Sequence, residues 1–389
     1  MQEKTRSVLK NPNLHIIFLV TLFAVIGVSS IAPALPLMVR ELHVNPVQIG
    51  LLITVFTLPG MILTPITGIL ADRYGRKTIL VPSLFLFGTA GFLCTFTRTF
   101  EILLLLRLFQ GFGAASLGAI NVTLIGDIFS GNQRAAAMGY NSSVLSIGTA
   151  FYPAIGGALA MAGWYYPFVL PILAIPIGLL VLFRLKNPEP EAPKSMKQYL
   201  LNTWNNINRP KVWGLFVINI LVFFVIYGTV LTYFPIHLEK RFGVTTLIIG
   251  LVISSMSITT AISSSLTGYL TRKFRVRNLL LTSYSIYMLA MCLIPVIDKI
   301  WLMIPVTLVA GLSHGIAMPN VQTLLVGMAP LTERAAFMSL NSMVLRTGQT
   351  LGPLFMGFIY SIADTEATFF AAAGIVLIMF IITFIFIKQ

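Results

Sequence analysis

Apolar stretches long enough to cross a lipid bilayer recur along this 389-residue chain, separated by short polar breaks. A transmembrane helix needs about 20 mostly apolar residues to span a bilayer core about 30 Å thick. Such stretches lie at 14–38, 48–71, 78–97, 101–125, 136–161, 165–183, 212–236, 246–270, 278–297, 300–326, 335–362 and 367–387. Because backbone groups in lipid must find their hydrogen bonds within the segment, these stretches are helices rather than strands. The pattern predicts an all-α integral membrane fold with twelve transmembrane helices.

The second half of the chain repeats the first at an offset of 200 positions. Segment 133–157 aligns with segment 333–357 with eleven identical positions, among which Asn141 pairs with Asn341. Duplicated membrane bundles commonly hold a substrate near the midplane between the halves and alternate access by rocking one half against the other. The repeat therefore predicts a transporter architecture of two six-helix halves.

The two halves are predicted at residues 1–183 and 212–389, joined by a cytoplasmic linker at 184–211. The linker opens with a run rich in proline and charge. Its later part, around Leu200 and Trp204, is typical of a short interfacial helix. We expect this segment to lie on the membrane surface.

Composition and charge place the chain in a membrane and orient it. Hydrophobic residues make up 57% of the chain and charged residues 10%, far below the quarter or so that is usual in soluble domains. With the N-terminus inside, nineteen Lys and Arg residues fall on the cytoplasmic side and five on the other. This asymmetry follows the positive-inside rule, so the net charge of +14 reflects topology rather than a nucleic-acid partner. We expect a multi-pass protein of the cell membrane with both termini cytoplasmic.

A strongly charged decapeptide, GILADRYGRK, separates the second and third apolar stretches. It resembles the loop motif of the major facilitator superfamily, and nearly the whole chain resembles the twelve-span drug:proton antiporters of that superfamily. The matching residues are Gly68, Leu70, Asp72, Arg73, Gly75, Arg76 and Lys77.

The resemblance implies that Asp72 latches one state of the transport cycle. In the family the matching aspartate sits against the start of a helix from the other half, where the partial positive charge favours an anion. Here that helix begins near Glu333 and Arg334. The alternative is that Asp72 only neutralises Arg73 and Arg76. The second half carries a cation in place of Asp72, so we expect one latch.

Two further motifs carry the resemblance. RLFQGFGAAS, which starts at Arg107, resembles the family motif built around a buried arginine, and Gln110 would flank the same cavity. Intramembrane charges normally face a cavity or a partner; the alternatives are that Arg107 extends to the outer interface or pairs with Glu101.

GTAFYPAIGG in the fifth helix resembles the motif that marks exporters. Its matching residues are Gly148, Pro153, Gly156 and Gly157. Tyr152 departs from the family pattern, which has glycine before the proline.

The membrane interior is predicted to hold cations and a histidine but no carboxylate. Arg107, Arg346 and His314 fall in the middle of predicted helices. Because an uncompensated charge at low dielectric is costly, such a cavity favours neutral amphiphiles or organic anions over cations. Arg346 alternatively bonds helix carbonyls.

Proton coupling needs a group that titrates near neutral pH, and His314 is the candidate by residue type. A packing role for His314 is the alternative, and Asp127 or Glu101 would then carry the proton.

Three polar side chains are candidates for the substrate cavity. Asn141 and Asn341 occupy duplicate positions in the fifth and eleventh helices, and Tyr227 lies in the seventh. Hydrogen bonding between helices is the alternative role of these residues.

We interpret the chain as a proton-coupled secondary active exporter of small amphiphilic compounds, of the multidrug efflux type. The alternatives are a dedicated exporter or flippase of an endogenous organic anion, siderophore or lipid, or a proton-coupled uptake symporter. The sequence has no nucleophile–base pair, phosphate loop or metal-ligand spacing, so we expect no enzyme activity, cofactor or metal. The partners are then the substrate, protons and the bilayer, and the protein is expected to be a monomer.

Overall fold

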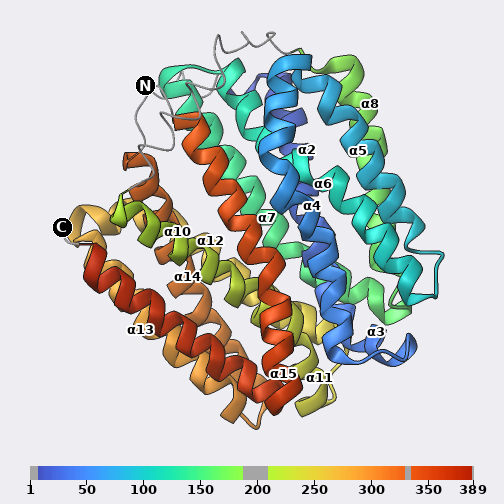
Figure 1. Cartoon of the computed structure of the whole chain (residues 1–389), viewed down its shortest axis with the longest axis vertical. Helices are drawn as coiled ribbons and strands as arrows, with labels where there is room; N and C mark the ends of the chain where they lie inside the picture. The colour runs from blue at the N-terminus through green and yellow to red at the C-terminus, as the bar shows by residue number, and fades with distance from the viewer. Residues whose placement is uncertain (1–7, 187–208, 329–333, 388–389) are drawn as a thin grey trace.

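The computed structural model describes residues 8–186, 209–328 and 334–387, and all regular structure in these ranges is helical (Figure 1). The first half contains α2 (Pro12–Ser29), η1 (Ala32–Ala34), α3 (Leu35–Glu41), α4 (Pro46–Tyr74), α5 (Arg76–Leu93), α6 (Phe100–Ile128), α7 (Gly131–Ala162), η2 (Tyr166–Leu173) and α8 (Ala174–Arg184). The second half contains α10 (Pro210–Phe223), η3 (Phe224–Tyr233), α11 (Phe234–Phe242), α12 (Thr246–Lys273), α13 (Val276–Leu293), η4 (Ile294–Val296), α14 (Ile300–Met328) and α15 (Arg334–Phe386). The prediction of an all-α fold is confirmed.

Local sequence explains where two of the helices start. The N–H of Asn13 donates to Oδ1 of Asn11, just before α2. At the start of α4, Asn45 and Gln48 form a capping box in which each side chain accepts from the other's backbone N–H, at 2.8 and 2.9 Å. These side chains satisfy helix donors that have no partner within the helix.

Ten helical runs in the described residues are long and apolar enough to cross a membrane. One of them, Leu340–Phe386, has 47 residues and would extend for about 70 Å at 1.5 Å per residue, more than twice a bilayer core. The backbone of α15 leaves helical geometry at Ala363 and Asp364, which divides this run in two. The 18-residue α5, which begins with two cations, lies outside the ten. The count of twelve crossings stays a prediction.

Four of the predicted apolar stretches contain 3₁₀ or π segments, which are η2 in the sixth stretch, η4 in the ninth, and one each in the first and the seventh. The first breaks at η1, a 3₁₀ turn that carries Pro33, and continues as α3. The seventh contains η3, a ten-residue π-helix between α10 and α11. All twelve apolar stretches were expected as plain helices, and the structure adds these 3₁₀ and π segments to that prediction.

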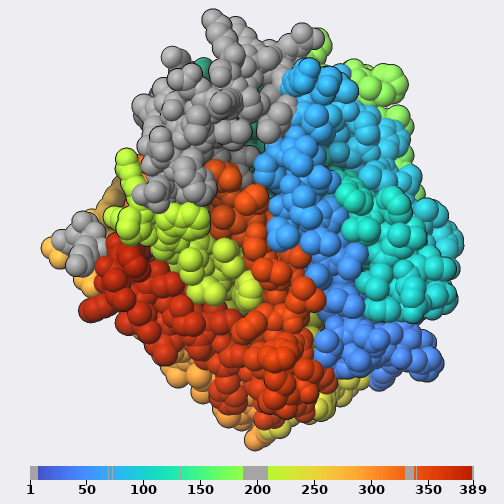
Figure 2. Space-filling model, in the orientation of Figure 1, coloured from blue at the N-terminus to red at the C-terminus, as the bar shows by residue number. Residues whose placement is uncertain are grey.

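The two halves meet along two pairs of long helices. In one pair α4 contacts α15, and in the other α7 contacts α12 (Figure 1). Figure 2 shows the surfaces of α4 and α15 meeting directly. We call the face where α2 begins the terminal face and the face with the 42–45 and 243–245 loops the opposite face; α3 and α11 lie near the opposite face.

The predicted linker falls mostly outside the described residues. α8 ends at Arg184 and α10 begins at Pro210, and residues 187–208 between them lie outside that range. The expected interfacial helix around Leu200 and Trp204 therefore has no description here.

Candidate functional site

Two glycines of the fifth-helix motif, Gly156 and Gly157, lie at close approaches between segments. A Cβ added at Gly157 of α7 would overlap the carbonyl oxygen of Thr246 in α12, across the boundary between the halves. The Thr246 hydroxyl donates to the Gly157 carbonyl at 2.8 Å. A Cβ at Gly156 would overlap the carbonyl of Ser30, within the same half. Both positions need glycine because backbone stands where a side chain would begin.

The same contact continues one turn along both helices. A Cβ at Gly250 of α12 would overlap the carbonyl of Pro153 in α7. The backbone N–H of Ala154 donates to Oγ of Ser254 at 3.1 Å. Gly148, farther from the opposite face, meets only side chains, with Tyr152 nearest. Motif residues Pro153 and Gly157 thus help to close the two halves against each other.

Threonines join the second pair of helices. Thr54 Oγ1 of α4 donates to the Thr350 carbonyl of α15 at 3.2 Å, and the Thr350 hydroxyl donates to Thr57 Oγ1 at 3.0 Å. Nearer the opposite face, Arg40 of α3 forms an ion pair with Glu239 of α11 at 2.9 Å. These contacts also cross from one half to the other.

The described hydrogen bonds between the halves all lie between the opposite face and the middle of the helices. In α4 they end near Thr57, and a Cβ added at Gly68 would meet nothing within 4 Å. Gly139 of α7 and Gly268 of α12, both toward the terminal face, also have open space. Within the described residues, the halves are joined at the opposite face.

Arg107 lies wholly inside the first half, with 0% of its surface exposed. Its guanidinium donates to the carbonyls of Leu52 and Gly27, at 3.2 and 2.8 Å, and to Oε1 of Gln110 at 2.7 Å. The ring of Phe56 lies 4.1 Å from its Cζ. Arg107 thus ties α2, α4 and α6 together, and it neither pairs with Glu101 nor reaches an interface in this conformation.

Arg346 of α15 lies at the boundary between the halves and is half-buried. Its Nη1 would lie 3.0 Å from a Cβ added at Gly60 of α4, and its Nη2 donates to the carbonyl of Ala114 in α6 at 3.4 Å. Tyr227 of η3 interacts with it electrostatically. Arg346 and Tyr227 are the predicted cavity residues that the structure brings together.

His314 of α14 packs toward α13 rather than toward the other half. Its ring centroid lies 6.4 Å from that of Tyr287, in a tilted arrangement. One turn away, Gly311 packs against the backbone of α12. The structure therefore places His314 apart from Arg346, among the helices of the second half.

Asn141 and Asn341 both make hydrogen bonds between helices. Asn141 Oδ1 accepts from Thr21 of α2 at 2.5 Å. Asn341 Oδ1 accepts from Asn219 of α10 at 2.8 Å, and its Nδ2 donates to Gln322 of α14 at 2.9 Å. Both are buried, so their geometry is that of the alternative role, hydrogen bonding between helices.

The charged decapeptide forms the junction of α4 and α5. Gly75 has φ +94°, a left-handed conformation that favours glycine and permits the sharp turn. Arg76 is buried, and its Nε donates to Asp127 of α6 at 3.1 Å. The side chain of Asp72 and residue Glu333 lie outside the described residues, so the latch stays a prediction.

The profile of the Major Facilitator Superfamily matches residues 17–275 and 237–389, which together cover nearly the whole chain. The chain belongs to the Major Facilitator Superfamily. It is a multi-pass membrane protein of a transporter family.

Curated relatives of this superfamily member include two proteins named for drug resistance and one named as an exporter. Multidrug resistance protein 1 of Bacillus subtilis (strain 168) is 27% identical over 368 residues, which cover 93% of each chain. The bacillibactin exporter of the same strain is 29% identical over 236 residues, or 58% of each chain. Quinolone resistance protein NorA of Staphylococcus aureus is 27% identical over 220 residues, covering 56% of this chain and 55% of NorA.

Solved structures share the fold. A bacterial homologue of the human lysosomal transporter Spinster, in an inward-facing and occupied conformation, matches with a TM-score of 0.80 at 17% identity over 96% of each chain. The human organic anion transporter MFSD10 matches with a TM-score of 0.70 at 17% identity, covering 96% of this chain and 100% of MFSD10.

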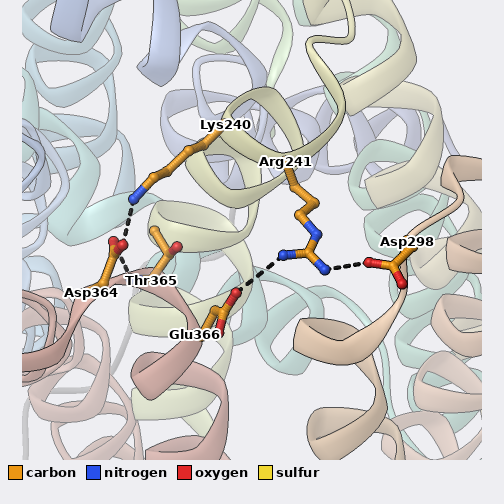
Figure 3. Close-up of polar contacts among 6 residues, drawn as sticks. All are labelled: Lys240, Arg241, Asp298, Asp364, Thr365 and Glu366. Atoms are coloured by element: carbon orange, nitrogen blue, oxygen red, sulfur yellow. Dashed lines mark hydrogen bonds and ion pairs between the residues drawn. The ribbon is translucent and has the colours of Figure 1, made fainter.

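A network of ion pairs at the opposite face was not foreseen from the sequence (Figure 3). Lys240 of α11 pairs with Asp364, at the break in α15. Arg241 pairs with Asp298 and, at 3.4 Å, with Glu366. These charges come from three separate chain segments, so their only sequence signal is a position at predicted helix ends. In this member of the Major Facilitator Superfamily the network fastens α11 to the neighbouring loops.

Proposed function

We propose that this Major Facilitator Superfamily member is a secondary active exporter, driven by the proton gradient, that moves small amphiphilic compounds out of the cell by alternating access. We further propose twelve membrane crossings, two six-helix halves and cytoplasmic termini, so that the terminal face is the cytoplasmic one. The observation that supports this is that the described hydrogen bonds between the halves, and the Arg40–Glu239 ion pair, lie in the region from mid-membrane to the opposite face. With that topology the conformation is closed to the outside, as an exporter must be when it takes up cargo.

The fifth-helix motif supports export over uptake. Its residues Pro153 and Gly157 lie in the contact that closes the opposite face. The relatives named multidrug resistance protein 1 and NorA support small drug-like compounds as cargo. The protein would act as a monomer in the cell membrane.

A second candidate is a dedicated exporter or flippase of an endogenous organic anion, siderophore or lipid. Arg346 favours it, because no described acidic residue forms an ion pair with this cation. The relative named bacillibactin exporter also supports it.

Proton coupling requires a group that gains and loses a proton during the cycle. His314 is our first candidate by residue type, and Asp127, which pairs with Arg76, is the second. Glu101, at the opposite-face end of α6, is the third.

Uphill movement in proteoliposomes tests the proposal. The purified protein is reconstituted with an imposed pH gradient, and accumulation of ethidium is measured beside that of the anionic probe dansylglycine. We expect accumulation of at least one probe above its equilibrium level, which disappears when a protonophore collapses the gradient. Equilibration alone, insensitive to the gradient, would contradict a proton-driven exporter.

A further inference from the structure

Arg346 lies immediately on the terminal-face side of the threonine contact that joins α4 and α15. The Oγ1 of Thr350, one turn along α15, lies 3.0 Å from Oγ1 of Thr57 and 2.9 Å from the carbonyl oxygen of Arg346. The guanidinium of Arg346 points across the boundary, toward Gly60 of α4 and Gly118 of α6. It therefore stands at the terminal-face end of the described hydrogen bonds between α4 and α15.

The guanidinium of Arg346 makes fewer described hydrogen bonds than its N–H groups could donate. Five N–H groups are available on an arginine side chain, and the hydrogen bond described for this one is the long 3.4 Å contact from Nη2 to the Ala114 carbonyl. The described ion pairs use acidic residues at helix ends and loops, not at this depth. A charge held at mid-membrane normally faces a water-filled cavity or a partner.

Arg107 provides the contrast within the same chain. The side chain of Arg107 is fully buried, with 0% exposure, and it donates hydrogen bonds to two backbone carbonyls and to Gln110. Arg346 is instead partly exposed, and glycines rather than side chains face it from α4 and α6. The absence of side chains at Gly60 and Gly118 lets the guanidinium approach the backbone of α4 and α6, and no side chain from these two positions pairs with its charge.

The surroundings suit an amphiphile that carries one negative group. Tyr227 interacts with Arg346 electrostatically and offers a phenolic hydroxyl. Phe223, one turn from Tyr227, packs its ring 5.8 Å from the tyrosine ring. A guanidinium fork matches the two oxygens of a carboxylate, and aromatic rings accept the apolar body of such a molecule.

We propose that Arg346 is the anion-binding residue of the transport site and selects amphiphilic organic carboxylates, with Tyr227 as a second polar contact. This assignment rests on the proposed export function for its biological meaning, but the binding step itself can be measured without transport. It distinguishes this chain from a carrier of organic cations.

Binding of three dansyl probes tests the site directly. Dansylglycine, dansylamide and dansylcadaverine share one fluorophore and are anionic, neutral and cationic. Their binding to the purified full-length protein in phosphatidylcholine nanodiscs is followed by fluorescence. We expect Arg346→Gln to weaken dansylglycine by about tenfold or more, the scale of one lost charge-assisted contact, and dansylamide by less than about twofold. Arg346→Glu should reverse the preference toward dansylcadaverine.

Arg272→Gln is the matched control, because it removes the same charge from an exposed position at the terminal face. It should leave all three affinities unchanged. Gly60→Ala keeps the charge but crowds the guanidinium, and it should weaken dansylglycine alone. Equal losses of dansylglycine and dansylamide in Arg346→Gln would overturn the proposal, as would tighter binding of dansylcadaverine than of dansylglycine by the wild type.

Two further measurements separate the possible outcomes. Repeating the titration in nanodiscs with added phosphatidylglycerol distinguishes a free carboxylate from a lipid head group as the ligand of Arg346. If the site binds lipid head groups, phosphatidylglycerol competes with dansylglycine and weakens its binding; if the site binds free carboxylates, the affinity for dansylglycine stays the same. Arg346-dependent binding without gradient-driven accumulation in proteoliposomes would leave the anion site standing and overturn the export proposal.

Discussion

The hydroxyl of Thr246 at the start of α12 donates to the carbonyl of Gly157 near the end of α7, at 2.8 Å, and so joins the two halves of the molecule. The carbonyl of Gly157 belongs to the last two turns of α7, which ends at Ala162. The residue that supplies it is a glycine of the fifth-helix motif, whose missing side chain allows the approach. Backbone proximity at this glycine thus contributes to the closure of the opposite face.

We predict that Gly157→Ala opens this contact. The added methyl group would overlap the Thr246 carbonyl, and the backbone there cannot move without separating α7 from α12. Spin labels at Glu41→Cys and Lys299→Cys should report longer or broader distances at the opposite face. Gly374→Ala, where a Cβ meets open space, is the matched control and should leave the distances unchanged. Unchanged distances in Gly157→Ala would show that the contact is not what holds this face closed.

Arg107→Gln should lower stability and transport together. The change removes charge-assisted hydrogen bonds to Leu52 and Gly27 in a site with no access to water. We expect the free energy of unfolding to fall by about 2–4 kcal/mol, observed as a lower melting temperature in detergent. Arg346→Gln, by contrast, should reduce anion transport with little change in melting temperature. A fully stable Arg107→Gln protein that fails to transport would instead indicate a direct role in the cycle.

Asp72→Asn should shift the balance between the two states of the carrier. If the carboxylate latches against the start of α15, its neutral amide binds the positive helix end less well. Labels at Gln133→Cys and Phe274→Cys, on the terminal face of each half, should then show altered distance populations. Identical populations would leave Asp72 with only the neutralising role beside Arg73.

His314→Gln should uncouple transport from the proton gradient. The amide cannot titrate, so downhill movement of substrate should continue while gradient-driven accumulation is lost. Tyr287→Phe, which alters the neighbouring ring and keeps the histidine, serves as the control. Retained gradient-driven accumulation in His314→Gln would transfer the proton-carrying role to Asp127 or Glu101.

The sequence predicts the membrane helices well because the bilayer imposes a simple rule on them. A run of apolar residues must satisfy its own backbone, so its length and position are readable without any tertiary information. The start of α4 at Pro46 and the end of α8 at Arg184 fall within two residues of the predicted limits. The π-helix η3 is not readable in this way, because apolar composition is the same for α and π winding.

The sequence identifies the charged residues of the candidate site but not the groups that they contact. Arg107 and Arg346 are both conspicuous as charges inside apolar runs, yet one is sealed against backbone carbonyls and the other lies at the boundary between halves. Backbone acceptors carry no sequence signature, so nothing in the residue pattern separates the two. Lys240 and Asp364 are likewise 124 positions apart, and only the fold brings them together.

The length of the seventh stretch depends on how many of its residues are wound as the π-helix η3. This π-helix is wound more loosely than the α-helices on either side, and it packs against α15, where Gly228 meets the Gly352 backbone. Because α winding turns the chain by about 100° per residue and the wider π winding by less, residues that passed from π to α winding would rotate the end of α11. Glu239 and Arg241 would then swing away from Arg40 and Asp298 together. A change of winding in η3, beside Arg346, would in this way be transmitted to the ion pairs that hold α11 at the opposite face.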